Sequence, residues 1–252
     1  MNSEPQPRVP SGRHIGPTNP FTVFPPDAIE QSIPARFEQQ VRQSPDRLAV
    51  KTARHALTYE ALNRLANRVA GAILARCGRG EEPVALLFEQ GAPLITAILG
   101  VLKAGKIYVP LDPTFPRARL TSMLADSQSR VIVTNTGTLP LAQALAQHGC
   151  QVLNVDDGAS LLSTENLALP LTPDTLACIF YTSGSTGRPK GVVHSHRTVL
   201  HAIANYTNRI HVCADDHLIL LYSCSAIGAV KDTFYALLNG AALYPFDVKE
   251  EG

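Results

Sequence analysis

The stretch LACIFYTSGSTGRPKG, residues 176–191, decides how the rest of the chain is interpreted. It opens with a short apolar run, Leu176 to Tyr181, which indicates a buried strand. A loop rich in glycine and hydroxyl side chains follows. Glycine lets the backbone approach a ligand closely, and successive N–H groups with hydroxyls and a lysine form a cradle for an anion, above all phosphate. We therefore expect a phosphate-binding loop rather than an ordinary serine–glycine turn between two strands. Its residues are Thr182, Ser183, Gly184, Ser185, Thr186, Gly187, Lys190 and Gly191.

The spacing of this loop differs from two common nucleotide-binding patterns. Counted from Gly184, the second glycine of a Walker loop is replaced by Pro189, which has no N–H to donate to a phosphate. The stretch also lacks G-x-G-x-x-G, so a dinucleotide site has little support. A kinase-type NTPase is thus the weakest enzyme class for this chain.

Composition narrows the possible partners and the compartment. The chain has 252 residues, 45% of them hydrophobic, and a net charge of +1, which is typical of a soluble globular protein and shows no electrostatic footprint for nucleic acid or an anionic membrane. The longest apolar stretch, 92–102, is too short to span a bilayer, and the N-terminus has no signal-peptide core. The 5 cysteines are scattered without a C-x-x-C pair, as in a reduced, cytoplasmic protein. We expect neither nucleic acid nor membrane as a partner.

Apolar runs that alternate with helical patterns predict an α/β fold with a mostly parallel sheet covered on both faces. Residues 1–31 are rich in proline and are expected to form a flexible lead or linker, and residues 32–252 form the folded part. In open α/β sheets the ligand lies at the carboxyl ends of the strands, where the glycine–serine loop lies here. Strands are predicted at 48–52, 83–88, 107–111, 131–134, 151–155, 176–181, 218–222 and 241–244, and helices at 34–44, 58–77, 93–104, 116–126, 139–147, 198–209 and 230–238.

Three histidines after the loop invite a metal interpretation, but their spacing does not favour it. His194, His196 and His201 have no carboxylate or thiolate at a supporting interval, and His196 and His201 are not one helical turn apart. We expect surface or hydrogen-bonded polar histidines and no metal ligands.

The motif YTSGSTGRPKG resembles, nearly letter for letter, the phosphate-loop signature of the adenylate-forming superfamily. That superfamily comprises acyl-CoA synthetases, adenylation domains of nonribosomal peptide synthetases, and luciferases. The stretch LKAGKIYVPLDPTFPRARL, 102–120, is similar to LKAG-x-Y-VP-(I/L)-D-P-x-(F/Y)-P-x-x-R of the peptide-synthetase branch. The likeness extends over roughly 32–247 and indicates the N-terminal half of an adenylation domain. Asp112 and Pro113 are expected to form a turn that Arg119 reaches from the next helix.

The resemblance implies that a carboxylate attacks the α-phosphate of ATP to give an acyl-adenylate and pyrophosphate, and that the acyl group then passes to a phosphopantetheine thiol. The partners would be a carboxylic acid and a phosphopantetheinyl carrier protein or CoA. The matching loop residues would hold the pyrophosphate together with Mg²⁺, and the loop glycines would let the loop close on ATP.

The chain ends at Gly252, before several parts that this superfamily carries. The motifs that contact adenine and ribose, the metal-binding glutamate and the small domain with the catalytic lysine are expected beyond this residue. The catalytic residues therefore stay unknown, and we expect the chain alone not to adenylate efficiently.

The segment YSCSAIGAVKDTFYALLNGAAL, 222–243, aligns with the segment that contributes to the acid pocket in this superfamily. Ile227 stands where members that activate amino acids place the aspartate that pairs with the substrate's α-ammonium. Burying an ammonium group without a counter-charge is unfavourable by several kcal/mol. We therefore expect an acid without an α-amine, such as a hydroxy, keto, aryl or fatty acid. Gly228 and Lys231 fall on other pocket positions; Lys231 meets an anionic substrate group, pairs with Asp232, or extends to solvent.

Two other functions are compatible with the sequence. An acyl-CoA or acyl-carrier-protein ligase would share the loop and the adenylate chemistry. A truncated, non-catalytic adenylation-like module would bind nucleotide or a partner synthetase without turnover.

Overall fold

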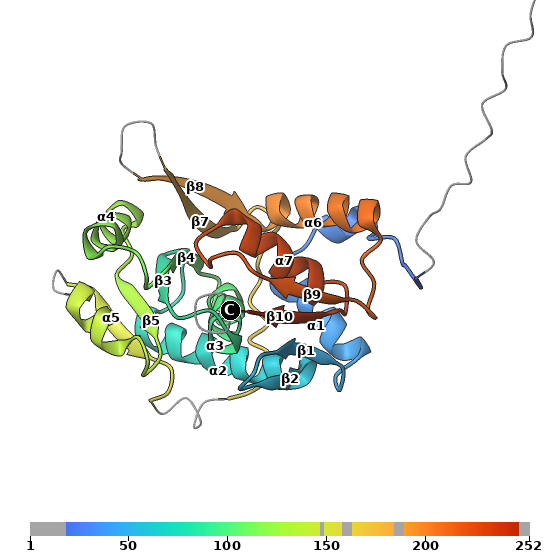
Figure 1. Cartoon of the computed structure of the whole chain (residues 1–252), viewed down its shortest axis with the longest axis horizontal. Coiled ribbons are helices and arrows are strands. Elements are labelled where there is room, and N and C mark those ends of the chain that lie inside the picture. Colours follow the sequence, from blue (N-terminus) through green and yellow to red (C-terminus); the bar gives the residue numbers. More distant parts are fainter. Residues whose placement is uncertain (1–18, 147–148, 158–162, 184–188, 247–252) are drawn as a thin grey trace, which may run out of the picture.

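The computed structural model describes residues 19–146, 149–157, 163–183 and 189–246. The predicted α/β class is confirmed, with two β-sheets (Figure 1). The larger sheet has the order β6-β5-β3-β4-β7-β8, and the smaller has the order β2-β1-β10-β9. The larger consists of β3 (Pro83–Leu87), β4 (Ile107–Leu111), β5 (Val131–Thr134), β6 (Gln151–Asn154), β7 (Leu176–Ser183) and β8 (Pro189–Ser195). The smaller consists of β1 (Leu48–Lys51), β2 (Ala56–Thr58), β9 (His217–Leu220) and β10 (Ala242–Pro245).

Most of the strand pairs are parallel, as predicted, but each sheet has one antiparallel edge strand. β8 pairs antiparallel with β7, and β2 pairs antiparallel with β1. The sequence prediction had neither β2 nor β8. β2 has only three residues, and β8 begins PKG, where proline, lysine and glycine weaken the apolar pattern of a strand.

The helices begin and end close to the predicted positions. Three of them start behind a side-chain cap: Ser32, Thr58 and Ser195 accept hydrogen bonds from backbone N–H groups three residues on. The helices are η1 (Pro26–Ile29, a 3₁₀ helix), α1 (Ile33–Gln43), α2 (Tyr59–Cys77), α3 (Ala92–Lys103), α4 (Arg117–Ser127), α5 (Leu139–Leu145), α6 (His196–Ile210) and α7 (Ile227–Leu237).

Helices α2 and α3 form the interior of the molecule. They pack against each other, α3 packs on β3 and β4, and α2 packs on β1 and β2, so the pair lies between the two sheets. Close approach of the two helices depends on Gly100: a Cβ atom there would lie 2.6 Å from Val69 Cγ1 and 3.1 Å from the Ala66 carbonyl oxygen. On the opposite face of the larger sheet, α4 and α5 bury a second apolar cluster.

The described end of the proline-rich lead packs on the folded part. Phe24 is 1% exposed, and its backbone N–H donates to Asn208 Oδ1 at 2.8 Å. The ring of Phe21 stacks on His211, with 4.3 Å between the ring centroids. Residues 19–31 therefore contact α6, whereas residues 1–18 lie outside the described part of the chain. The domain boundary at residue 31 stays a prediction.

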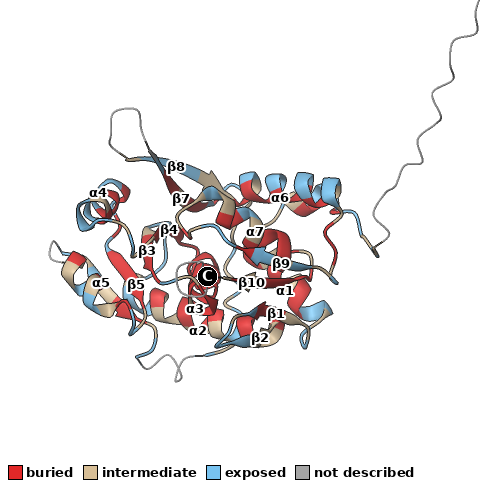
Figure 2. Ribbon diagram, in the orientation of Figure 1, coloured by how far each residue is buried: buried red, intermediate tan, exposed pale blue. Residues whose placement is uncertain are grey.

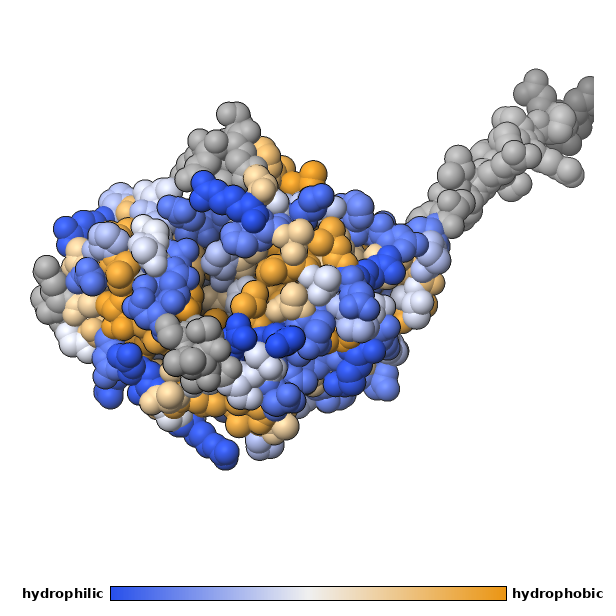
Figure 3. Space-filling model, turned by 90° about the horizontal axis from the view of Figure 1, so that it is seen from below, coloured by the Kyte–Doolittle hydropathy of each residue, from blue (hydrophilic) through white to orange (hydrophobic). Residues whose placement is uncertain are grey.

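The surface mixes polar and apolar side chains, as the face in Figure 3 shows. Among the described residues, no helix has both the length and the apolar character needed to cross a bilayer. Large apolar side chains are nevertheless exposed along the edge strand β9 and just after it, where Ile219, Leu221 and Tyr222 are 60%, 57% and 56% exposed.

Candidate functional site

The hairpin of β7 and β8 carries the part of the predicted phosphate loop that the structure describes (Figure 1). Thr182 pairs with Lys190 across the hairpin, and Ser183 pairs with Pro189. The structure thus brings Thr182 and Lys190 together at the mouth of the loop, and the side chains of both are exposed. The loop residues Gly184, Ser185, Thr186 and Gly187 lie outside the described residues.

Tyr181 anchors the base of this hairpin to α4. Its hydroxyl donates to Asp126 Oδ2 at 2.7 Å and lies 3.3 Å from the Met123 carbonyl oxygen. Burial, and next the bond to Asp126, raise the pKa of Tyr181 above its ordinary value, so the phenol stays a hydrogen-bond donor. Gly191 lies opposite Tyr181, and a Cβ atom at Gly191 would lie 3.1 Å from Ile179 Cγ2 and 3.4 Å from the Tyr181 ring. Glycine at 191 therefore makes room for the anchoring ring.

Asp112, directly after β4, lies at the same carboxyl edge, because β4 and β7 are parallel neighbours. Asp112 Oδ1 accepts hydrogen bonds from the backbone N–H and the hydroxyl of Thr114, at 2.9 Å and 2.7 Å. Asp112 Oδ2 accepts a hydrogen bond from the Ser223 hydroxyl at 2.5 Å. The predicted turn is present, and Ser223 is a partner that the sequence gave no reason to expect, since 111 residues separate the two. The guanidinium of Arg119 lies over the Phe115 ring, 3.9 Å from its centroid.

The predicted pocket residues lie at the start of α7. Ile227 is its first residue and is 43% exposed; Lys231, one turn later, is also exposed. Gly228 allows close approach of Tyr222, since a Cβ atom at Gly228 would lie 2.8 Å from that ring. Burial raises the pKa of Asp232, and the positive charge of Lys231 lowers it in part. The helix starts three residues before the predicted start at Val230, so Ile227 and Lys231 share one helical face.

The histidines have structural surroundings in the described part of the chain. His196 is 1% exposed, and its Nδ1 accepts a hydrogen bond at 3.2 Å from the backbone N–H of Ile33, the first residue of α1. Burial lowers the pKa of His196 to about 4, so the ring is neutral and can accept this bond. His201 contacts Asn205. Among the described residues, no group of three or more histidine, cysteine, aspartate or glutamate side chains is placed to hold a metal ion.

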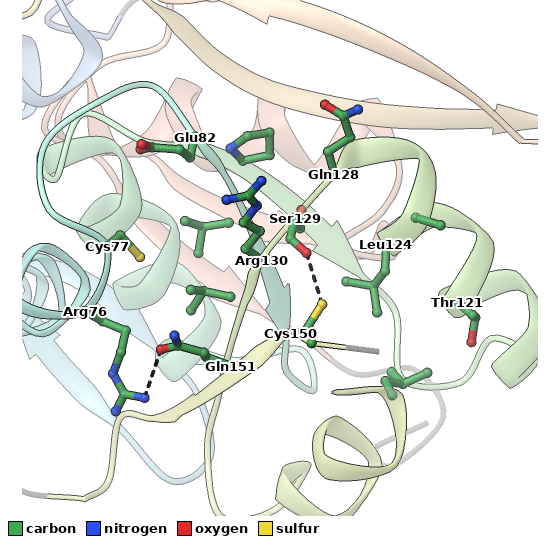
Figure 4. A pocket seen from close by; sticks show the side chains of 16 residues that line it. Arg76, Cys77, Glu82, Thr121, Leu124, Gln128, Ser129, Arg130, Cys150 and Gln151 are labelled. Atoms are coloured by element: carbon green, nitrogen blue, oxygen red, sulfur yellow. Dashed lines mark hydrogen bonds between the residues drawn. The ribbon is translucent and has the colours of Figure 1, made fainter. Parts of the chain in front are cut away.

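A concavity of about 1000 Å³ lies at the opposite, amino-terminal end of the larger sheet (Figure 4). Its walls come from the starts of β3, β5 and β6, the end of α2, and α4. Arg76, Glu82 and Arg130 are among its lining residues, and none of the predicted site residues is. Its polar side chains are mostly exposed. Arg76 and Gln151 are hydrogen-bonded at 3.4 Å, and the Cys150 thiol donates to the Ser129 carbonyl oxygen at 3.1 Å. This concavity therefore does not coincide with the candidate site, which we place at the residues that follow the carboxyl ends of the strands.

Comparisons with known proteins identify relatives and structural neighbours of the chain. The chain is 36% identical over 219 residues to tyrocidine synthase 1 of Brevibacillus parabrevis, a match that covers 87% of this chain and 20% of that protein. The AMPPNP-bound structure of the nonribosomal peptide synthetase FmoA3 superposes with a TM-score of 0.79 at 31% identity, over 92% of this chain and 24% of that one. The N-terminal subdomain of Klebsiella oxytoca NpsA, 23% identical with a TM-score of 0.74, shares the fold over 87% of this chain and 56% of that one.

The chain thus spans about a fifth of the length of tyrocidine synthase 1 and about a quarter of FmoA3. The profile of the family described as "AMP-binding enzyme" matches residues 37–251, which is most of the chain and includes both the β7–β8 hairpin and the start of α7. This chain belongs to the family of AMP-binding enzymes.

Proposed function

We propose that this chain forms the phosphate-binding side, and one wall of the acid pocket, of an enzyme that activates a carboxylic acid with ATP as an acyl-adenylate. The acyl group then passes to a phosphopantetheine thiol on a carrier protein. The observation that carries the proposal is the pairing of Thr182 with Lys190 at the mouth of the loop, at the carboxyl edge of a parallel sheet. The match to a family described as "AMP-binding enzyme" and the AMPPNP-bound structure of a relative both support a nucleotide phosphate as the anion that this site binds.

The chemistry makes a cation at this position useful. An anionic carboxylate must approach the α-phosphate of a polyanion and expel pyrophosphate, so negative charge has to be stabilised throughout. Donors that are held in place before the reaction lower such a barrier most effectively. In our proposal Lys190 and the hydroxyl of Thr182 bind the β- and γ-phosphates, with Ser183, Ser185 and Thr186 and the loop backbone completing the site. Gly184, Gly187 and Gly191 leave space for that backbone.

A magnesium ion is expected with the nucleotide, and it would neutralise phosphate charge. The described residues offer no three-residue cluster of metal-binding side chains, so the ion would be held mainly by the phosphates and by groups outside the described part of the chain. Asp112 is committed to Thr114 and Ser223, and is not assigned to the metal.

For the substrate, Ile227 favours an acid that lacks the α-amine. The side chain lies at the exposed start of α7 and presents a hydrocarbon surface where an α-ammonium group would need a carboxylate. Hydroxy, keto, aryl and fatty acids satisfy this condition. A ligase that uses CoA as the acyl acceptor is the nearest alternative, because it needs the same nucleotide loop and the same acid pocket.

Isothermal titration calorimetry of the chain with AMPPNP tests the nucleotide assignment. We expect Lys190→Ala to weaken binding about tenfold or more, since a charge-assisted contact to phosphate is lost. Arg130→Ala is the matched control: it removes an exposed cation at the amino-terminal concavity and should leave the affinity unchanged. Equal binding by wild type and Lys190→Ala would contradict the proposal.

The acid class is tested by acid-dependent ATP–pyrophosphate exchange in a protein that contains this chain. Leucine is compared with its 2-oxo and 2-hydroxy analogues, and benzoate and octanoate are added. We expect the amine-free acids to support faster exchange than leucine. A preference for leucine over both analogues would exclude the substrate proposal, and nucleotide binding without exchange would favour the non-catalytic module.

A further inference from the structure

One carboxylate joins the two sheets at the candidate site. Asp112 follows β4 of the larger sheet, and Ser223 lies between β9 of the smaller sheet and α7. The distance between Asp112 Oδ2 and Ser223 Oγ is 2.5 Å, in the range of a short, charge-assisted bond between a hydroxyl and a carboxylate. Because such bonds are stronger than neutral ones, this contact restrains two segments that have no covalent connection nearby.

The serine end of this bridge controls how α7 begins. Ser223 Oγ bonds to Ser225 Oγ at 2.9 Å and accepts a bond from the Ser225 N–H at 3.3 Å. The Ser223 carbonyl oxygen accepts from the Ala226 N–H at 2.9 Å. Ala226 is the N-cap of α7 and has no side chain that caps the helix; the serine turn fixes the backbone directly before it.

The other end of the bridge is fixed to the strand that adjoins the phosphate hairpin. Asp112 Oδ1 is held by Thr114 in a turn directly after β4, and β4 pairs with β7. A shift of Ser223 relative to Asp112 would therefore move Ile227 and Gly228 relative to the hairpin that carries Lys190.

We propose that Asp112 is a positioning residue: through Ser223 it holds the first turn of α7, which forms the acid-pocket wall, at a fixed place relative to the phosphate loop. This inference rests on the proposed function, because it gives Asp112 the role of fixing the position of the acid relative to the nucleotide. Asp112 itself touches neither the acid nor the nucleotide. In-line attack requires the acid and the α-phosphate in a narrow range of relative positions. A restraint between the acid-pocket wall and the phosphate loop therefore favours the reaction.

The first measurement is hydrogen–deuterium exchange of the chain without ligands. Ser223→Ala removes the bridge, together with the bonds between Ser223 Oγ and Ser225, and leaves the Asp112–Thr114 turn. We expect amides of α7 to exchange about tenfold faster, with those of α3 unchanged. Thr114→Val is the matched control, because it removes a hydroxyl from the same carboxylate but leaves Ser223 in place; α7 should exchange as in wild type. Unchanged exchange of α7 in Ser223→Ala overturns the proposal, whatever the ligands do.

The second measurement separates positioning from a general structural role. The chain is titrated with AMPPNP, and then, at saturating AMPPNP, with 4-methyl-2-oxopentanoate, 2-hydroxy-4-methylpentanoate, benzoate and octanoate. For the acid that binds best, we expect Ser223→Ala to raise Kd about tenfold while Kd for AMPPNP changes less than about threefold. Ser223→Thr, which keeps the hydroxyl, should restore acid binding. Equal losses for acid and nucleotide would overturn the proposal.

The two measurements also separate failure of this inference from failure of the proposed function. A longer protein that contains this chain and binds no AMPPNP contradicts the proposed function, and the exchange of α7 still decides whether Asp112 positions the helix. If the wild-type chain binds AMPPNP, and Ser223→Ala changes neither the amide exchange of α7 nor the affinity for the acid, the function is supported and the positioning role is excluded.

Discussion

Helix α3 and the edge strand β8 are opposites in burial (Figure 2). In α3 every residue but Pro93 is buried, whereas no residue of β8 is. The hairpin nevertheless carries Thr182 and Lys190, the described residues that the proposed function assigns to the nucleotide. Packing and ligand binding are thus divided between two regions, because a loop that must admit a polyanion cannot also be part of a close-packed core. Substitutions in the helix pair should change stability, and substitutions in β8 should leave it nearly unchanged.

The largest loss of stability is expected from Glu38→Gln. Glu38 forms an ion pair with Lys103 at the end of α3, where the lysine side chain is only 2% exposed. Lys103 Nζ also donates to Asn166 Oδ1 at 3.2 Å. Burial lowers the pKa of Lys103, and the bond to Glu38 opposes that shift. Without the carboxylate, a buried charge is left without its counter-ion, and the free energy of unfolding should fall by about 3–5 kcal/mol in urea titrations.

A second substitution checks the cause of that loss. Glu38→Gln combined with Lys103→Met removes both charges and should recover most of the stability, since no unpaired charge is then left buried. A double variant as unstable as Glu38→Gln would show that the ion pair is not responsible.

A smaller effect is expected from pH at the junction of hairpin and core, where His196 follows β8. The pKa of His196 is about 4 in the folded chain, below the ordinary 6.5, because the ring is buried. Between pH 6.5 and pH 4 the unfolded chain therefore binds a proton at His196 that the folded chain does not bind. This contribution to the free energy of unfolding is complete above about pH 6.5 and is lost as the pH falls towards 4. The loss is at most about 3 kcal/mol. Urea titrations at successive pH values measure it.

The control for this pH dependence is His196→Asn. The asparagine Oδ1 can accept the Ile33 N–H bond but does not titrate. Its stability should depend less on pH between 6.5 and 4. His194, whose pKa is also lowered by burial, contributes a remaining slope of the same sign. An unchanged slope in His196→Asn would contradict the assignment.

Gly100→Ala is expected to lower the stability less than the changes above, and it tests the contact between the interior helices α2 and α3 directly. The new Cβ atom would lie 2.6 Å from Val69 Cγ1, and the β-branched valine has little rotational freedom in a helix. The steric cost of about 1–3 kcal/mol exceeds the helix-propensity gain of up to about 1 kcal/mol, so the melting temperature should fall. Val69→Ala in the same chain should relieve only part of the clash, because the Cβ atom of residue 69, at 2.7 Å, and the Ala66 carbonyl oxygen, at 3.1 Å, remain. A Gly100→Ala variant as stable as wild type would mean that α2 and α3 are packed less closely.

The same division explains which features could be predicted from the sequence. Buried strands are local apolar runs, so β4 and β5 were predicted with their observed ends, and α3 was displaced by one residue. The Asp112–Ser223 bridge depends on the meeting of two sheets, and no local pattern encodes it. The burial of Phe24 was missed for the same reason, since a proline-rich composition describes the backbone and not a distant partner on α6. The phosphate loop stays a prediction from its residue types, since residues 184–188 lie outside the described part of the chain.

The smallest effect is expected from Val193→Thr on β8, and it sharpens the contrast with the interior. Val193 is 49% exposed, pairs with Ile179 across the hairpin, and belongs to the edge strand of the larger sheet. Threonine has the same shape and a similar preference for strands, so little apolar area and no ladder hydrogen bond are lost. We expect the free energy of unfolding to change by less than about 0.5 kcal/mol, and AMPPNP affinity to be unchanged. A loss comparable to that of Gly100→Ala would mean that this face of the hairpin is covered in solution, and the separation of binding from packing would then fail at β8.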